Sequence, residues 1–159
     1  MFKAKGTLIY DPRSDASKFT SWWAKLDVPR SVVQYYQYWV KRELGIHLNT
    51  PIWKAHITVM RGEEPRKQWL WKKYQNKEIE FSYTPDIRMS ETYAWIPAQS
   101  EQLEQIRTEL GLRPQPRVPF HITIGNTKNL EKIIKEVKVP FTVFPWEDVK
   151  IVDRLWRNQ

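Results

Sequence analysis

Short runs of apolar and β-branched residues, each bounded by turn residues, alternate along the chain with segments of helical periodicity. Such runs predict strands, and they occupy residues 3–10, 52–60, 78–84 and 87–96. Asp11-Pro12 ends the first run and Pro85-Asp86 separates the last two, as expected of turn signals.

Apolar residues at helical spacing predict a helix between Pro29 and Gly45. Proline suits the first turn of a helix, and glycine suits the left-handed position after its last turn. Ser100 can cap a second helix through Leu110, which Gly111 ends. Helices are also expected near 65–74 and 129–138, with a loop at 113–119 and an extended segment at 140–152.

One tetrapeptide pattern occurs twice, as His56-Ile57-Thr58-Val59 and His121-Ile122-Thr123-Ile124, and uses two of the three histidines. Successive side chains of a strand point to opposite faces, so the His and Thr of each motif share one face. The apolar residues of the motif share the other. Each motif strand therefore offers an imidazole and a hydroxyl side by side, and two such strands can line one cleft.

The mixed order of elements, with one motif strand in each half, predicts an α+β fold. We expect antiparallel or mixed sheets in two similar lobes, which line a central cleft with the helices outside. No linker divides the sequence, so residues 1–159 are expected to form a single domain.

The chain is basic and rich in aromatic residues, with a net charge of +8, nine Trp and seven Tyr. Positive charge favours anionic partners, and aromatic rings can stack on nucleobases, although most are expected in the core. The absence of cysteine excludes disulfides and thiolate zinc sites. Without an apolar leader or an apolar run long enough to cross a bilayer, a cytoplasmic protein with no membrane association is expected.

Two His-x-Thr pairs around one phosphodiester can carry out acid and base catalysis. One neutral imidazole can take a proton from an attacking hydroxyl, and the other, protonated, can give one to the departing oxygen. Thr58 and Thr123, with nearby arginines, can bind the nonbridging oxygens. A ribose 2′-hydroxyl is the simplest nucleophile because it already lies beside the 3′-phosphate. This chemistry requires no metal or cofactor.

Other interpretations of the motifs remain open. Histidine and threonine in a strand can be purely structural. Imidazole is also a common metal ligand, but no carboxylate or third histidine stands at ligand spacing near either motif, and His47 lies in a predicted loop. A catalytically silent module that uses its charge and exposed aromatics for weak RNA binding belongs to a different functional class.

At the two motifs the chain resembles the 2H phosphoesterase superfamily, which is named for paired His-x-Thr or His-x-Ser strands in a bilobal, pseudo-symmetric fold. The resemblance implies phosphodiester chemistry at His56, Thr58, His121 and Thr123. The superfamily includes RNA 2′,5′-ligase-like enzymes and phosphodiesterases that act on 2′,3′-cyclic phosphates or 2′,5′-oligoadenylates. The motif alone therefore leaves the substrate open.

Within that superfamily the chain is most similar to the phage anti-CBASS nucleases. Three features carry this likeness. They are the segment Gly6-Thr7-Leu8-Ile9-Tyr10, the arginines Arg113 and Arg117 before the second motif, and Pro145-Trp146-Glu147-Asp148 with Trp156. The likeness implies metal-independent opening of cyclic di- and trinucleotide messengers such as 3′,3′-cyclic GMP–AMP, through 2′-hydroxyl attack. It also implies a role against host immunity in the bacterial cytoplasm, with no obligatory protein partner.

Five further residues are candidates for binding the substrate. Tyr10, Trp146 and Trp156 could stack on bases, and a core position is the alternative for Tyr10. Arg113 could hold phosphate or a base edge through its forked donors, unless it belongs to a solvated basic loop. Glu147 could accept a hydrogen bond from a base or a catalytic group.

Overall fold

The computed structural model of the protein describes residues 1–12, 20–51, 53–127 and 142–143. Its two α-helices within these ranges are α1 (Arg30–Leu44) and α2 (Glu101–Glu109), and a single 3-10 turn, η1, spans Gln68–Leu70. The strands are β1 (Phe2–Tyr10), β2 (Ala24–Asp27), β3 (His56–Met60), β4 (Glu78–Tyr83), β5 (Arg88–Met89), β6 (Tyr93–Gln99), β7 (His121–Asn126) and β8 (Thr142–Val143).

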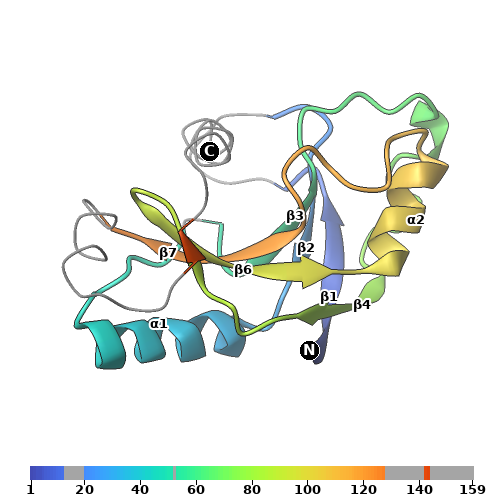
Figure 1. Cartoon of the computed structure of the whole chain (residues 1–159). Coiled ribbons are helices and arrows are strands. Elements are labelled where there is room, and N and C mark those ends of the chain that lie inside the picture. Colours follow the sequence, from blue (N-terminus) through green and yellow to red (C-terminus); the bar gives the residue numbers. More distant parts are fainter. Residues whose placement is uncertain (13–19, 52, 128–141, 144–159) are drawn as a thin grey trace.

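Six antiparallel strands close into a barrel. The order is β4-β1-β2-β3-β7-β6, and β4 pairs with β6 through Ser82 opposite Gln99 and Tyr83 opposite Ala98. β5 adds to β6, and β8 pairs with β5 in parallel. Figure 1 shows α1 along one side of this sheet and α2 beyond the end of β6. The α+β class is confirmed, while the two pseudo-symmetric lobes and the cleft between them stay predictions.

Helix α1 covers the side of the sheet that carries the isoleucines of the motif strands. Its buried residues recur at helical spacing, at Val32, Val33, Tyr36 and Val40. The Gln37 side-chain amide donates to the carbonyl oxygen of Ile124 on β7 at 2.9 Å. The predicted C-terminal cap is confirmed, because Gly45 takes a left-handed φ of 67° and its N–H bonds the Lys41 carbonyl.

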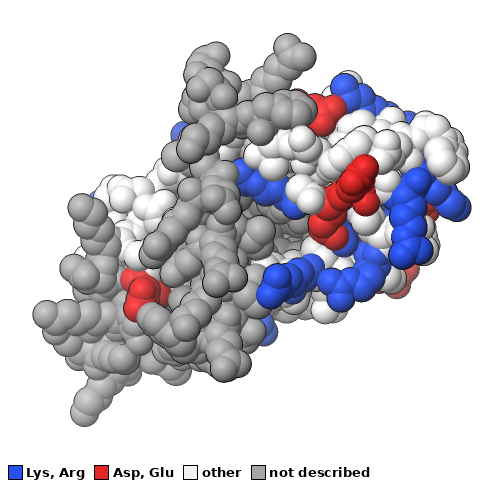
Figure 2. All heavy atoms as spheres, turned by 90° about the horizontal axis from the view of Figure 1, so that it is seen from above, with Lys and Arg blue, Asp and Glu red and all other residues white. Residues whose placement is uncertain are grey.

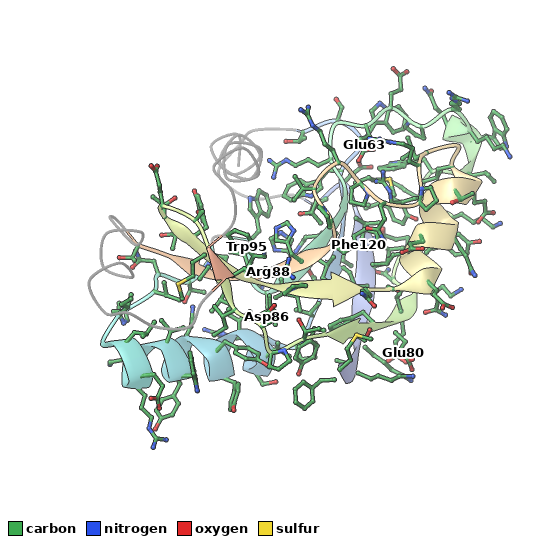
Figure 3. All side chains as sticks on the ribbon, viewed as in Figure 1. Glu63, Glu80, Asp86, Arg88, Trp95 and Phe120 are labelled. Carbon is green, nitrogen blue, oxygen red and sulfur yellow. The ribbon has the colours of Figure 1, made fainter. Side chains whose placement is uncertain are left out.

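Helix α2 starts at the predicted cap, where the Ser100 hydroxyl accepts a hydrogen bond from the Leu103 N–H at 3.3 Å. The helix also carries Arg107, whose side chain is fully buried. The Arg107 guanidinium forms a forked ion pair with Glu63, at 2.9 and 2.7 Å. Glu63 is labelled in Figure 3.

The remaining donors of Arg107 link the two halves of the chain. Nη1 donates to the carbonyl of Val59 in β3 at 2.8 Å, and Nε donates to the carbonyl of Arg113 at 2.9 Å. Arg113 lies in the loop that leads to β7. One buried cation therefore ties α2 to the strand of the first motif and to the approach of the second.

Three predicted elements were wrong in extent or type. The helix expected at 65–74 is reduced to η1, and Lys72 takes a positive φ of 66° that helix geometry does not allow. The strand expected over 52–60 begins only at His56. The strand expected over 87–96 is two strands, β5 and β6, because the Ser90 hydroxyl accepts hydrogen bonds from Thr92 and Tyr93 and makes a turn.

β2 was not predicted at all, since four residues are too few to show a period. The predicted strand at 3–10 and the helix from 100 are confirmed. The predicted helix at 129–138 and most of the extended segment at 140–152 lie outside the described residues.

Candidate active site

The two motif strands are direct neighbours. Ile57 of β3 pairs with Ile122 of β7 in an antiparallel register, and both isoleucines are fully buried. This register sets His56 opposite Thr123 and Thr58 opposite His121, with all four side chains on the face away from the isoleucines. The structure therefore brings together the four residues that the repeat singled out, and each imidazole faces the hydroxyl of the other motif.

The flanking strands extend this face on both sides. On β2, Asp27 pairs with His56, and Lys25 pairs with Thr58. On β6, Trp95 pairs with Thr123, and Pro97 pairs with His121. Two parallel rows of side chains result, namely Asp27–His56–Thr123–Trp95 and Lys25–Thr58–His121–Pro97. We call these eight residues the site face.

Trp95 forms one wall of the site face. Its ring lies edge-on to the His121 ring, with centroids 6.4 Å apart and an interplanar angle of 69°. Figure 3 shows Trp95 rising from the side of the sheet opposite α1. Its position next to the second histidine was not predicted, because β6 carries no motif that points to it.

Both catalytic candidates make the same hydrogen bond. Nδ1 of His56 lies 3.0 Å from the carbonyl oxygen of Lys54, and Nδ1 of His121 lies 2.8 Å from that of Pro119. A carbonyl only accepts, so Nδ1 carries a hydrogen in each ring and donates it. Nε2 is then an acceptor in the neutral ring and a donor in the protonated ring, as a general base and a general acid require.

The electrostatics of the site face favour neutral imidazoles in the free protein. Burial lowers the pKa of His56 to about 4, against the opposing effect of its hydrogen bond to the Lys54 carbonyl. The charges of Lys25 and His121 lower it further, and Asp27 raises it. Burial also lowers the pKa of His121, while the Pro119 carbonyl raises it. An anionic phosphate between the rings would favour their protonated forms.

The two rings differ in how far they are shielded from solvent. His56 is 4% exposed, whereas His121 is only partly buried. An imidazolium therefore costs less solvation free energy at His121 than at His56. The site thus has one ring better suited to stay neutral and another better suited to carry the proton.

Lys25 and Asp27 also belong to the site face and were not predicted from the sequence. Lys25 is 6% exposed, and its ammonium forms an ion pair with the Asp27 carboxylate at 2.5 Å. The alternation Lys25-Leu26-Asp27 is the signal that could have found them, since it places both charges on one face of a strand. The alternation could not be interpreted in this way, because β2 was not predicted as a strand.

Of the five predicted substrate-binding residues, the structure describes only Tyr10 and Arg113. Tyr10 is 4% exposed and packs edge-on against Trp71 with ring centroids 4.8 Å apart, so it lies in the core. Arg113 is exposed, and Arg107 holds its carbonyl. Trp146, Glu147 and Trp156 lie outside the described residues. Contact of these residues with a base or phosphate stays a prediction.

Figure 2 looks onto the molecule from the side opposite α1. Lys and Arg side chains gather along one half of the described surface in this view, interspersed with acidic residues. Among the described residues, no group of three or more His, Asp or Glu side chains is placed to hold a metal ion. No helix within the same residues is both long and apolar enough to cross a membrane.

A family model described as the Swiss Army Knife 2H phosphoesterase domain matches residues 40–131, which is more than half of the chain. The chain belongs to the 2H phosphoesterase family. The match includes both His-x-Thr strands of this 2H phosphoesterase, and the six-stranded antiparallel barrel fits the fold of the family. Membership suggests hydrolysis of phosphodiesters. Comparison with curated proteins and with solved structures found no significant match.

Proposed function

We propose that this 2H phosphoesterase is a metal-independent phosphodiesterase that cleaves RNA-type linkages by attack of a ribose 2′-hydroxyl. The observation that carries the proposal is the antiparallel pairing of Ile57 with Ile122, which sets His56 and His121 on one face, each opposite a threonine. In each ring the carbonyl bond to Nδ1 leaves Nε2 to exchange protons.

In the first step a neutral histidine takes the proton of the 2′-hydroxyl, and the 2′-oxygen attacks the adjacent phosphorus. The bond from phosphorus to the 5′-oxygen breaks, and the second, protonated histidine gives its proton to that oxygen. A 2′,3′-cyclic phosphate and a free 5′-hydroxyl result. Thr58 and Thr123 donate hydrogen bonds to the nonbridging oxygens as negative charge grows there. Water can open the cyclic phosphate with the two histidines in exchanged roles.

We assign the base of the first step to His56 and the acid to His121. His56 is the more deeply buried ring and the one beside the Lys25 ammonium, so its neutral form is favoured, with a pKa of about 4. The partly exposed His121 ring is the better place for the positive charge that a general acid needs.

The substrate that we propose is a small cyclic di- or trinucleotide such as 3′,3′-cyclic GMP–AMP, cleaved at a 3′–5′ linkage in the cytoplasm. A net charge of +8 supports a ligand with several phosphates. The likeness of the first strand, of the arginines before the second motif and of the Trp146-Glu147 segment to the anti-CBASS nucleases supports the cyclic form. Degradation of such a messenger would counteract CBASS immunity.

The test is to incubate the protein in EDTA with 3′,3′-cyclic GMP–AMP, a 2′,3′-cyclic-ended RNA and 2′,5′-triadenylate, and to resolve products by chromatography and mass. Selective opening of the cyclic dinucleotide is expected. Preference for either linear RNA would move the assignment to RNA processing or ligation. Binding without any product would support the RNA-binding module instead. For the variants His56→Ala and His121→Ala in this assay, the matched control is His47→Ala, which removes an exposed histidine outside the site.

A further inference from the structure

Lys25 is a buried cation on the site face that takes no part in the proton transfers of the two-histidine mechanism. It pairs in register with Thr58 on one side and with Ile9 on the other, and it is 6% exposed. Burying an ammonium is unfavourable unless opposite charge compensates for its lost hydration. The partner on the same strand face is Asp27, at 2.5 Å.

Within the described residues, the Lys25 ammonium uses only part of its donor capacity in the ion pair with Asp27. An ammonium has three hydrogens, and Asp27 is the one carboxylate within salt-bridge distance among the described residues. Asp27 is itself about half exposed, so the pair opens toward solvent on the carboxylate side. A purely structural role would be met as well by an apolar residue at position 25, since buried ion pairs are often no more stable than hydrophobic replacements.

The register defines what Lys25 can reach. Lys25, Thr58 and His121 stand in one row on adjacent strands, and neighbours across an antiparallel pair lie about 4.5–5.5 Å apart. The row from Lys25 to His121 is therefore roughly 10 Å long at the backbone. A phosphate above Thr58 would lie between the ammonium and the imidazole. Attack by the 2′-oxygen raises the negative charge on this group, so a cation here acts more strongly on the transition state than on the bound substrate.

We propose that Lys25 is a catalytic residue that donates a hydrogen bond to a nonbridging oxygen of the scissile phosphate, and that Asp27 is its positioning residue. The inference rests on the proposed function and adds to it a charge that the motifs do not supply. Asp27 has a second effect through its pairing with His56, because its carboxylate raises the pKa of that ring while Lys25 lowers it.

The test compares Lys25→Met, which keeps the length of the side chain without its charge, with Lys25→Arg, which keeps the charge. The substrate is uridine 3′-(p-nitrophenyl phosphate), which has an RNA-type linkage and a chromogenic leaving group. Removing one transition-state donor typically costs about 10²–10³-fold in kcat. We expect a loss of about that size in Lys25→Met with little change in KM, and partial recovery in Lys25→Arg. The matched control is Lys41→Met on the exposed side of α1.

A phosphorothioate provides a readout that a structural role would not move. Sulfur in place of the nonbridging oxygen that Lys25 contacts should slow one diastereomer of the wild-type reaction, and Lys25→Met should reduce this difference. Asp27→Asn should lower kcat and shift the acid limb of the pH profile to lower pH, since Asp27 raises the pKa of His56. Lys25→Gln serves in the same assays if Lys25→Met does not fold.

The outcomes separate this inference from the proposed function. If the wild type cleaves the substrate and His56→Ala does not, while folded Lys25→Met keeps kcat within about twofold and the full diastereomer difference, the role of Lys25 is refuted and the function stands. If the wild type cleaves neither this substrate nor any of the three nucleotides in EDTA, the proposed function itself fails.

Discussion

Protonation of His56 should destabilise the fold, because the buried ring binds a proton less readily than the same ring in the unfolded chain. Burial lowers its pKa from 6.5 to about 4. Each pKa unit corresponds to about 1.4 kcal/mol, so complete protonation of this one residue should lower the free energy of unfolding by about 3 kcal/mol. The stabilisation is fully present above pH 6.5 and is lost as pH falls from 6.5 to about 4, where the unfolded state binds more protons than the folded state.

Urea unfolding at constant ionic strength, from pH 7.5 down to pH 4, measures this effect when wild type is compared with His56→Gln. Glutamine is neutral at every pH, so the difference in unfolding free energy between the two proteins isolates the histidine. Relative to the variant, the wild type should lose about 3 kcal/mol over this range. His47→Gln is the control for an exposed histidine. A difference that stays constant within about 0.5 kcal/mol would show that His56 is not buried as a neutral ring.

Two further results are expected from the same structure. Glu63→Gln should destabilise the protein by about 3–5 kcal/mol in thermal or urea unfolding, because the fully buried Arg107 loses the carboxylate that compensates its charge, and a loss below about 1 kcal/mol would contradict this. The second concerns the acid and base roles. Replacing His121 by Ala should cost about 10²–10⁴-fold in kcat with an ordinary ribose leaving group but far less with p-nitrophenolate, whereas His56→Ala should be equally harmful with both. The opposite pattern would exchange the two roles.

The parts of the fold that could be predicted are those specified by local residues. Pro29 and Gly45 bound α1 because each has a backbone preference that suits one end of a helix, and Ser100 starts α2 for a similar reason. The helix expected at 65–74 was wrong because aromatic and basic residues there have helical spacing, yet Lys72 adopts a positive φ. Backbone conformations of this kind depend on contacts that sequence spacing does not describe.

The candidate site, like the fold, could be predicted from the sequence only in part. The repeat predicted which histidines and threonines share a face, and the pairing of Ile57 with Ile122 then places both motifs on one sheet face. The carbonyls that orient the rings belong to Lys54 and Pro119, and any residue type can supply a carbonyl, so no sequence signal exists for them. Lys25 could not be predicted as part of the site, because its place beside Thr58 depends on the pairing of β2 with β3.

The most direct test of the proposed function is the turnover of 3′,3′-cyclic GMP–AMP in EDTA by wild type, His56→Ala and His121→Ala, with the analogue that lacks both 2′-hydroxyls as the comparison substrate. The two-histidine mechanism predicts that wild type opens the ribose form and leaves the deoxy form intact, and that each variant loses at least about 10²-fold in rate while remaining folded. Comparable cleavage of the deoxy analogue, or wild-type rates in both variants, would contradict it.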